Sequence, residues 1–183
     1  SVIFEITDKG EIKKSHIAHT VIKSDRRFTY EEVQQIIETG EGEYKEEIFA
    51  ADNIAKLIRK KRFEQGAISF ERWEMKFDID ETGKPIGIYI KESKDANKLV
   101  EEFMLLANRY VAESIGKVPH NKKPKVFPYR IHDTPDPVKL ENLSQFISRF
   151  GYKVRTVGSK QDIAKSINGL LDEVHGKKEE NLI

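Results

Sequence analysis

The sequence has no cysteine, which excludes disulfide bonds, a zinc site built on thiolates and a cysteine nucleophile. It also lacks any apolar run near the roughly 20 residues of a membrane-spanning helix, and no secretory signal is visible. Positive charge is scarcely in excess, with 32 Lys and Arg against 31 Asp and Glu, so bulk charge does not indicate a nucleic-acid partner. These absences predict a soluble, cytoplasmic protein with no membrane partner.

The composition is that of a folded domain with a large surface. Hydrophobic residues make up 38% of the 183 residues and charged residues 34%, while ten Phe and six Tyr argue against disorder. No internal repeat or boundary divides the chain, so we expect residues 1–183 to form a single segment. The first residues, SVIFEI, read directly as a strand and the last, KKEENLI, read as helix. We therefore expect the chain to be part of a longer protein.

Hydrophobic spacing and turn residues predict an α+β fold in which antiparallel β-hairpins pack with long helices. One hairpin is expected from strands at 2–6 and 12–23, and a second from residues 66–80 and 86–92. Helices are expected at 30–39, 44–64, 95–115, 137–150 and 160–174. Thr29 and Glu32 form a capping-box pattern that starts the first helix, and Gly40 ends it.

The expected helix at 95–115 carries an acid and an amide on its apolar side. At about 100° per residue, Glu101 and Asn108 project about 20° apart among apolar positions. The solvated stripe of the helix is expected to contain Lys98, Glu102, Arg109 and Glu113. A buried carboxylate must be paired, hydrogen-bonded or protonated. The residues alone favour an internal structural anchor over a catalytic role for Glu101, and both readings stay open.

Phe70 lies among charges on one face of an expected strand. The core face of this strand is expected to contain Trp73, Met75, Phe77 and Ile79, and the opposite face Arg72, Glu74 and Lys76. An aromatic ring in that setting suits stacking on a planar ligand, which contributes about 1–3 kcal/mol per nucleic-acid base. A β-bulge that returns Phe70 to the core is an equally good explanation.

Tyr30, at the first position of the first helix, follows two arginines. A phenol and the guanidiniums of Arg26 and Arg27 near a helix N-terminus would suit a phosphate group. Alternatively, Tyr30 packs along the helix onto Val33 and Ile37. Spacing does not decide between the two.

Three stretches, GAISFERWEMKFDIDETGKP, DANKLVEEFMLLAN and YRIHDTPDPVKLENL, resemble the ribonuclease R group of the bacterial ribonuclease II (RNB) exoribonuclease family in order and spacing. The similarity extends over essentially the whole chain. It implies part of an RNB catalytic domain, in which magnesium-dependent, processive 3′→5′ hydrolysis degrades single-stranded RNA to nucleoside 5′-monophosphates. The RNA 3′ end is the expected partner.

The resemblance also implies roles for three residues. Phe70 matches the family's aromatic that stacks on terminal bases, while Glu101 and Tyr30 match supporting residues of the active cavity and RNA contacts. The family's aspartate cluster, its late arginine motif and its flanking RNA-binding barrels have no counterpart in residues 1–183. We therefore expect no metal site in this segment, magnesium only in the parent enzyme, and no catalysis by the chain alone.

A second hypothesis is a non-catalytic RNA-binding or interaction module that keeps the scaffold without the chemistry. The near-neutral net charge of +1 slightly favours it, since phosphate binding usually needs a basic excess. In either case, core surface left without its neighbours would allow the isolated chain to self-associate.

Overall fold

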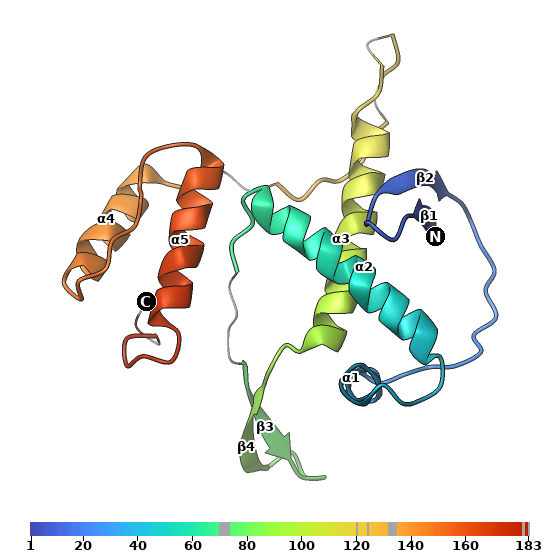
Figure 1. Cartoon of the computed structure of the whole chain (residues 1–183), viewed down its shortest axis with the longest axis horizontal. Coiled ribbons are helices and arrows are strands. Elements are labelled where there is room, and N and C mark those ends of the chain that lie inside the picture. Colours follow the sequence, from blue (N-terminus) through green and yellow to red (C-terminus); the bar gives the residue numbers. More distant parts are fainter. Residues whose placement is uncertain (70–73, 120, 124, 132–134, 181, 183) are drawn as a thin grey trace. The chain divides into compact units, whose positions relative to one another are not determined.

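The structure is a computed structural model, which describes residues 1–69, 74–119, 121–123, 125–131, 135–180 and 182. Its elements along the chain are β1 (Val2–Ile6), β2 (Ile12–Ile17), α1 (Tyr30–Thr39), α2 (Lys45–Glu64), β3 (Glu74–Ile79), β4 (Pro85–Lys91), α3 (Asp95–Gly116), α4 (Pro137–Ser148) and α5 (Lys160–Val174) (Figure 1). The predicted α+β class is confirmed. The expected strand at 12–23 is shorter than predicted, because β2 ends at Ile17.

Internal contacts divide the chain into two compact units. The first comprises Ser1–Arg59 with Glu71–Tyr129, and the second comprises Lys60–Phe70 with Arg130–Ile183. Both sheets are two-stranded and antiparallel, β1 with β2 and β3 with β4, and each has a register shift near its turn. Among the described residues, no helix combines the length and apolar character needed to cross a bilayer.

In the first unit, α3 contacts the β1–β2 hairpin, α1 and α2. The β1–β2 hairpin contacts it through Phe4 and Tyr110, whose rings meet edge to face with centroids 5.4 Å apart. α1 contacts its N-terminal end, where the Gln34 Oε1 atom accepts a hydrogen bond from the buried Ala96 amide at 3.0 Å. That side-chain oxygen satisfies one of the early amides that a helix leaves without an internal acceptor.

The local signals for α1 are present as predicted. Thr29 Oγ1 accepts from the Glu32 amide at 3.2 Å, and the Glu32 carboxylate accepts from the Thr29 amide at 2.7 Å. Gly40 closes the helix in the left-handed conformation, with φ of 76°. Both ends of this helix are therefore set by residues adjacent in sequence.

The second unit contains α4 and α5, which lie side by side in Figure 1. Its core consists of Ile147, Tyr152, Leu170 and Val174, with Leu143 and Val154 packed against it. Asp136 caps α4 by accepting from the Val138 amide at 2.8 Å, with Pro137 as the first helical residue. The end of α4 at Ser148 is two residues earlier than expected.

The β3–β4 hairpin corrects one prediction. Phe77 pairs with Ile88 and Met75 with Ile90, so the apolar residues do share a face. That face is not in the core of this chain, however, because Phe77 is 55% exposed and its neighbours are similarly open. Alternation predicts which side chains share a face, but it does not supply the surface that covers them. Trp73, Arg72 and Phe70 lie outside the described residues.

Candidate functional site

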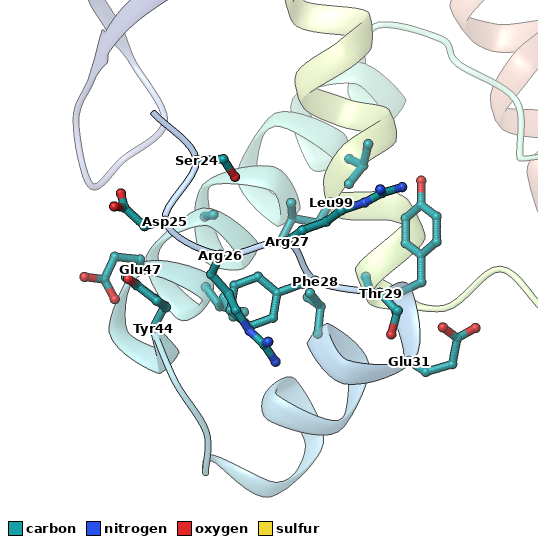
Figure 2. A pocket seen from close by; sticks show the side chains of 16 residues that line it. Ser24, Asp25, Arg26, Arg27, Phe28, Thr29, Glu31, Tyr44, Glu47 and Leu99 are labelled. Atoms are coloured by element: carbon teal, nitrogen blue, oxygen red, sulfur yellow. The ribbon is translucent and has the colours of Figure 1, made fainter. Parts of the chain in front are cut away.

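A cleft of about 950 Å³ opens in the first unit between the segment before α1, the helices α1 and α2, and the N-terminal part of α3 (Figure 2). Its apolar wall includes Phe28, Val33, Tyr44, Ile48, Leu99 and Val100. Its polar lining includes Asp25, Arg26, Arg27, Tyr30, Glu31 and Glu47. The sequence-predicted trio of Arg26, Arg27 and Tyr30 therefore does come together around one cavity.

The two neighbouring arginines differ in their surroundings. The Arg26 guanidinium is 2.9 Å from Glu32 and 3.3 Å from Glu43, and it lies 5.1 Å from the centre of the Phe28 ring. These contacts join the segment before α1 to the helix and to the turn that follows it. Arg26 is thus neutralised by acids of its own unit and holds local structure.

Arg27 extends in the opposite direction, toward Leu99 of α3 (Figure 2). Within the part of the chain that the structure describes, no hydrogen bond or ion pair is found for Arg27. Tyr30 is 45% exposed and lines the same cleft. An exposed guanidinium and a phenol beside an apolar wall can receive a ligand that combines an anionic group with a planar apolar part.

The N-terminus of α1 is less suited to phosphate than the sequence suggested. Its capping box already provides an acceptor for the Glu32 amide, and Glu31 and Glu32 place two acids in the first turn. Those carboxylates take the favourable position at the positive end of the helix dipole. In this cleft, Arg27 and Tyr30 are better placed to bind an anion than the backbone amides of α1.

The structure corrects which polar residues of α3 were expected to be buried and which exposed. Glu102, predicted on the solvated stripe, is 1% exposed and lies 3.3 Å from the Arg59 guanidinium of α2. Glu101 is half-buried and does not line the cleft, whereas Asn108 is exposed. The prediction was wrong for Glu102 because α2 supplies a positive charge to the face that it covers. Glu102 and Arg59 are the pair that sequence reasoning missed.

A second ionic group lies along the same interface between α2 and α3. Lys56 donates a hydrogen bond of 2.7 Å to the buried Asp52 and lies 3.1 Å from Asp95. The hydrogen bond to Asp52, supported by Asp95, raises the pKa of Lys56 above its ordinary value. The i, i+4 spacing of Asp52 and Lys56 is a signal that sequence reasoning had available.

The described residues contain no group of three or more His, Asp or Glu that could hold a metal ion. Magnesium in proteins is bound mainly through carboxylates and water. The residues described here therefore do not fit a magnesium site, and no step of a reaction is assigned to magnesium on them. Phe70, the third predicted site residue, lies outside the described residues.

Comparison with known proteins places this geometry in context. A family model described as "RNB domain" matches residues 1–183. The chain is 31% identical to ribonuclease R of Aquifex aeolicus over 182 residues, which covers 96% of this chain and 25% of that protein. It is 33% identical to the exosome complex exonuclease RRP44 of Homo sapiens over 176 residues, covering 94% of this chain and 17% of that protein.

Solved structures give the same picture for the fold. The chain superposes on Mycoplasma genitalium RNase R in complex with ribose-methylated single-stranded RNA with a TM-score of 0.79, at 23% identity, covering 97% of this chain and 28% of that one. For the complex of the same enzyme with double-stranded RNA, the TM-score is 0.76 at 25% identity, covering 94% and 31%. The chain spans between 17% and 31% of the length of these proteins.

Proposed function

Because the chain belongs to the RNB family, we propose that it is a segment of a processive, hydrolytic 3′→5′ exoribonuclease that degrades single-stranded RNA to nucleoside 5′-monophosphates. The observation that carries this proposal is the match of the RNB model to all 183 residues. The cleft that contains Arg27 and Tyr30 supports it, because a guanidinium and an aromatic ring beside an apolar wall suit an RNA phosphate and its base.

In this proposal the chain contributes RNA contacts and supporting groups. Arg27 and Tyr30 bind the RNA at the cleft, Glu101 supports the active cavity from α3, and Phe70 stacks on the bases at the 3′ end. Magnesium belongs to the parent enzyme, where it would activate water and stabilise the leaving oxygen. Since the described residues offer no carboxylate cluster for it, we propose that this chain alone does not cut RNA.

The test is RNA hydrolysis by the purified chain and by the full-length gene product. Both are incubated with a uniformly labelled single-stranded RNA oligonucleotide and magnesium, and the released mononucleotides are quantified. We expect release by the full-length protein and none by the chain. Magnesium-dependent release by the chain, with contaminating nuclease excluded, would overturn its proposed inactivity. A full-length protein that binds the oligonucleotide without shortening it would instead be the non-catalytic RNA-binding module.

The exposed apolar face of the β3–β4 hairpin could let the isolated chain self-associate. Phe77 and Ile88 lie opposite each other there, and both are open to solvent. Apolar surface of this kind favours association with a second copy. Light scattering should show a mass that rises with concentration, and Phe77→Lys should lower it. A monomer at all concentrations would contradict self-association.

A further inference from the structure

Charge is divided unevenly between the two units of the chain. The second unit contains 12 Lys and Arg against 9 Asp and Glu, a net charge of +3, whereas the first contains 20 against 22, a net charge of −2. The segment after α2 is held to the second unit by Asn168 of α5, whose Oδ1 atom accepts from the Ser69 amide and whose Nδ2 atom donates to the Ala67 carbonyl, both at 2.9 Å. The near-neutral total therefore hides a positive unit, and an excess of positive charge attracts a polyanion.

Two phenylalanines lie exposed at the end of α4 in this positive unit. Phe146 and Phe150 are each 39% exposed, and their rings meet edge to face with centroids 5.4 Å apart. The backbone stays helical through Arg149, with φ of −65° and ψ of −23°, so the two rings lie one turn apart on a common face. Ile147 occupies the core instead and is fully buried. The ring pair therefore forms an apolar patch on the surface of the unit.

The same face of α4 carries two cations and no acid. At about 100° per residue, Lys139 projects within about 20° and Arg149 within about 60° of the direction of Phe146. Glu141, the one acid between Pro137 and Ser148, projects about 140° away from Phe146, and its carboxylate accepts a hydrogen bond from Gln145. We define the outer face of α4 by its five exposed residues, which are Lys139, Asn142, Phe146, Arg149 and Phe150.

The two cations of this face are not neutralised by acids of the chain. Within the described ranges, the side chains of Lys139 and Arg149 make no hydrogen bond or ion pair. The cations Arg59, Arg109 and Lys56, by contrast, each lie within 3.3 Å of a carboxylate. A cation beside an exposed ring offers what single-stranded nucleic acid requires, which is a charge for its phosphate and a ring for its base. A second copy of the chain is disfavoured here, because it would bring like charges together.

We propose that the outer face of α4 is a second contact for single-stranded RNA, separate from the cleft of the first unit. Lys139 and Arg149 bind phosphates, and neighbouring bases stack on Phe146 and Phe150. The choice of RNA rests on the proposed function, since RNA is the polyanion that an exoribonuclease must hold. The outer face adds affinity for a strand longer than the cleft can hold and takes no part in hydrolysis.

The experiment compares two lengths of RNA on the full-length gene product. Fluorescent single-stranded RNAs of about 5 and about 25 nucleotides, one near the smallest common site size and one well beyond it, are followed by anisotropy in EDTA, which prevents metal-dependent cleavage. Phe146→Leu/Phe150→Leu removes both rings and keeps apolar side chains, Phe146→Tyr/Phe150→Tyr keeps the rings, and Arg149→Met removes one charge. Lys165→Met, at an exposed position of α5 in the same unit, is the matched control for charge. All variants are compared at equal folded fraction, measured by circular dichroism.

We expect the double Leu variant to bind the long RNA about tenfold more weakly than the wild type and to bind the short RNA equally well. The double Tyr variant should match the wild type for both lengths, because its rings still stack. Arg149→Met should weaken binding of the long RNA alone, by about threefold, and reduce the slope of log affinity against log salt concentration by about 0.7. Lys165→Met should leave both affinities unchanged.

Three outcomes would overturn the inference. Unchanged binding of the long RNA by the double Leu variant and by Arg149→Met would do so and leave the proposed function intact. Light scattering would then assign the face to a second copy of the chain if the mass of the double Leu variant falls, and to another protein if it does not. Equal weakening for both lengths would place the effect in the cleft or the fold. A wild type that binds neither RNA would remove the proposed function as well. If the double Leu variant does not fold, Arg149→Met and Lys139→Met decide by the same comparison of lengths.

Discussion

Glu102 of α3 is withdrawn from solvent, with 1% of its side chain exposed, and the Arg59 guanidinium of α2 lies 3.3 Å away as a compensating charge. The two residues are 43 positions apart and hold the two long helices in one register. A buried carboxylate that loses its partner keeps its desolvation cost without the attraction that offset it.

Arg59→Met should therefore lower the free energy of unfolding by about 3 kcal/mol, at the lower end of the range for breaking a buried pair because Arg59 is 21% exposed. The double variant Arg59→Met/Glu102→Leu should recover most of that loss. Arg109→Met is the control, because its pair with Glu113 is exposed and should contribute less than about 1 kcal/mol. Urea unfolding checks all three, and equal losses for Arg59→Met and Arg109→Met would contradict the buried pair's importance.

The two arginines before α1 should separate in their effects. Arg27→Met should weaken binding of a labelled single-stranded RNA oligonucleotide by about fivefold at 0.1 M salt. It should also reduce the slope of log affinity against log salt concentration by about 0.7, the value for one phosphate contact. Arg26→Met should lower stability instead, because Arg26 pairs with Glu32 and Glu43. Fluorescence anisotropy across salt concentrations, with thermal melting alongside, distinguishes them. Equal effects of both variants on affinity would argue against Arg27 as the RNA contact.

Two glycines near the end of α1 form a natural comparison. A Cβ atom at Gly42 would lie 2.6 Å from the Cγ1 atom of Ile36, a buried residue, whereas a Cβ atom at Gly40 would meet nothing within 4 Å. Both have positive φ, 140° and 76°. Gly40→Ala should cost about 1 kcal/mol for its backbone conformation alone. Gly42→Ala should lower stability by more than Gly40→Ala does. If thermal unfolding shows the larger loss for Gly40→Ala, the contact with Ile36 is contradicted.

The cap of α5 makes a prediction about pH. Hydrogen bonds from Ser159, first from its hydroxyl and then from its amide, lower the pKa of Asp162 below its ordinary value. The Asp162 carboxylate therefore binds a proton more weakly in the folded state than in the unfolded chain. The contribution of Asp162 to stability is complete above the unfolded pKa of about 3.9 and is lost as pH falls through the lower, folded pKa. Carbon-detected NMR should show the Asp162 pKa rising toward its ordinary value in Ser159→Ala, and no rise would contradict the stated cause.

Sequence reasoning was strongest where the cause is local. The start of α1 follows from Thr29 and Glu32, and the start of α4 from Pro137, because these residues act within one turn of the helix that they begin. The same reasoning failed for Glu102, whose burial depends on a charge from another helix. Periodicity ranks the sides of a helix by polarity, but which side is covered is decided by the partner that packs there.

The candidate site shows the same division. Arg26, Arg27 and Tyr30 are adjacent in sequence, so their presence around one cleft was predictable, but the neutralisation of Arg26 by Glu43 was not. Asn168 gave no signal in the sequence, because an asparagine on a helix surface is ordinary. Its side-chain amide accepts a hydrogen bond from the Ser69 amide and donates one to the Ala67 carbonyl, about a hundred residues earlier in the chain.

That separation has a consequence for how the chain is made. At about 5–20 residues per second, the ribosome adds Asn168 about 5–20 s after Ser69, so the segment that Asn168 anchors waits without its partner. Closing a loop of about a hundred residues costs about 4 kcal/mol in chain entropy, which delays such a contact relative to local turns. The stretch from Ala67 to Ser69 therefore takes its final path late in maturation, and a nascent chain halted before α5 would lack both hydrogen bonds that hold this stretch to Asn168.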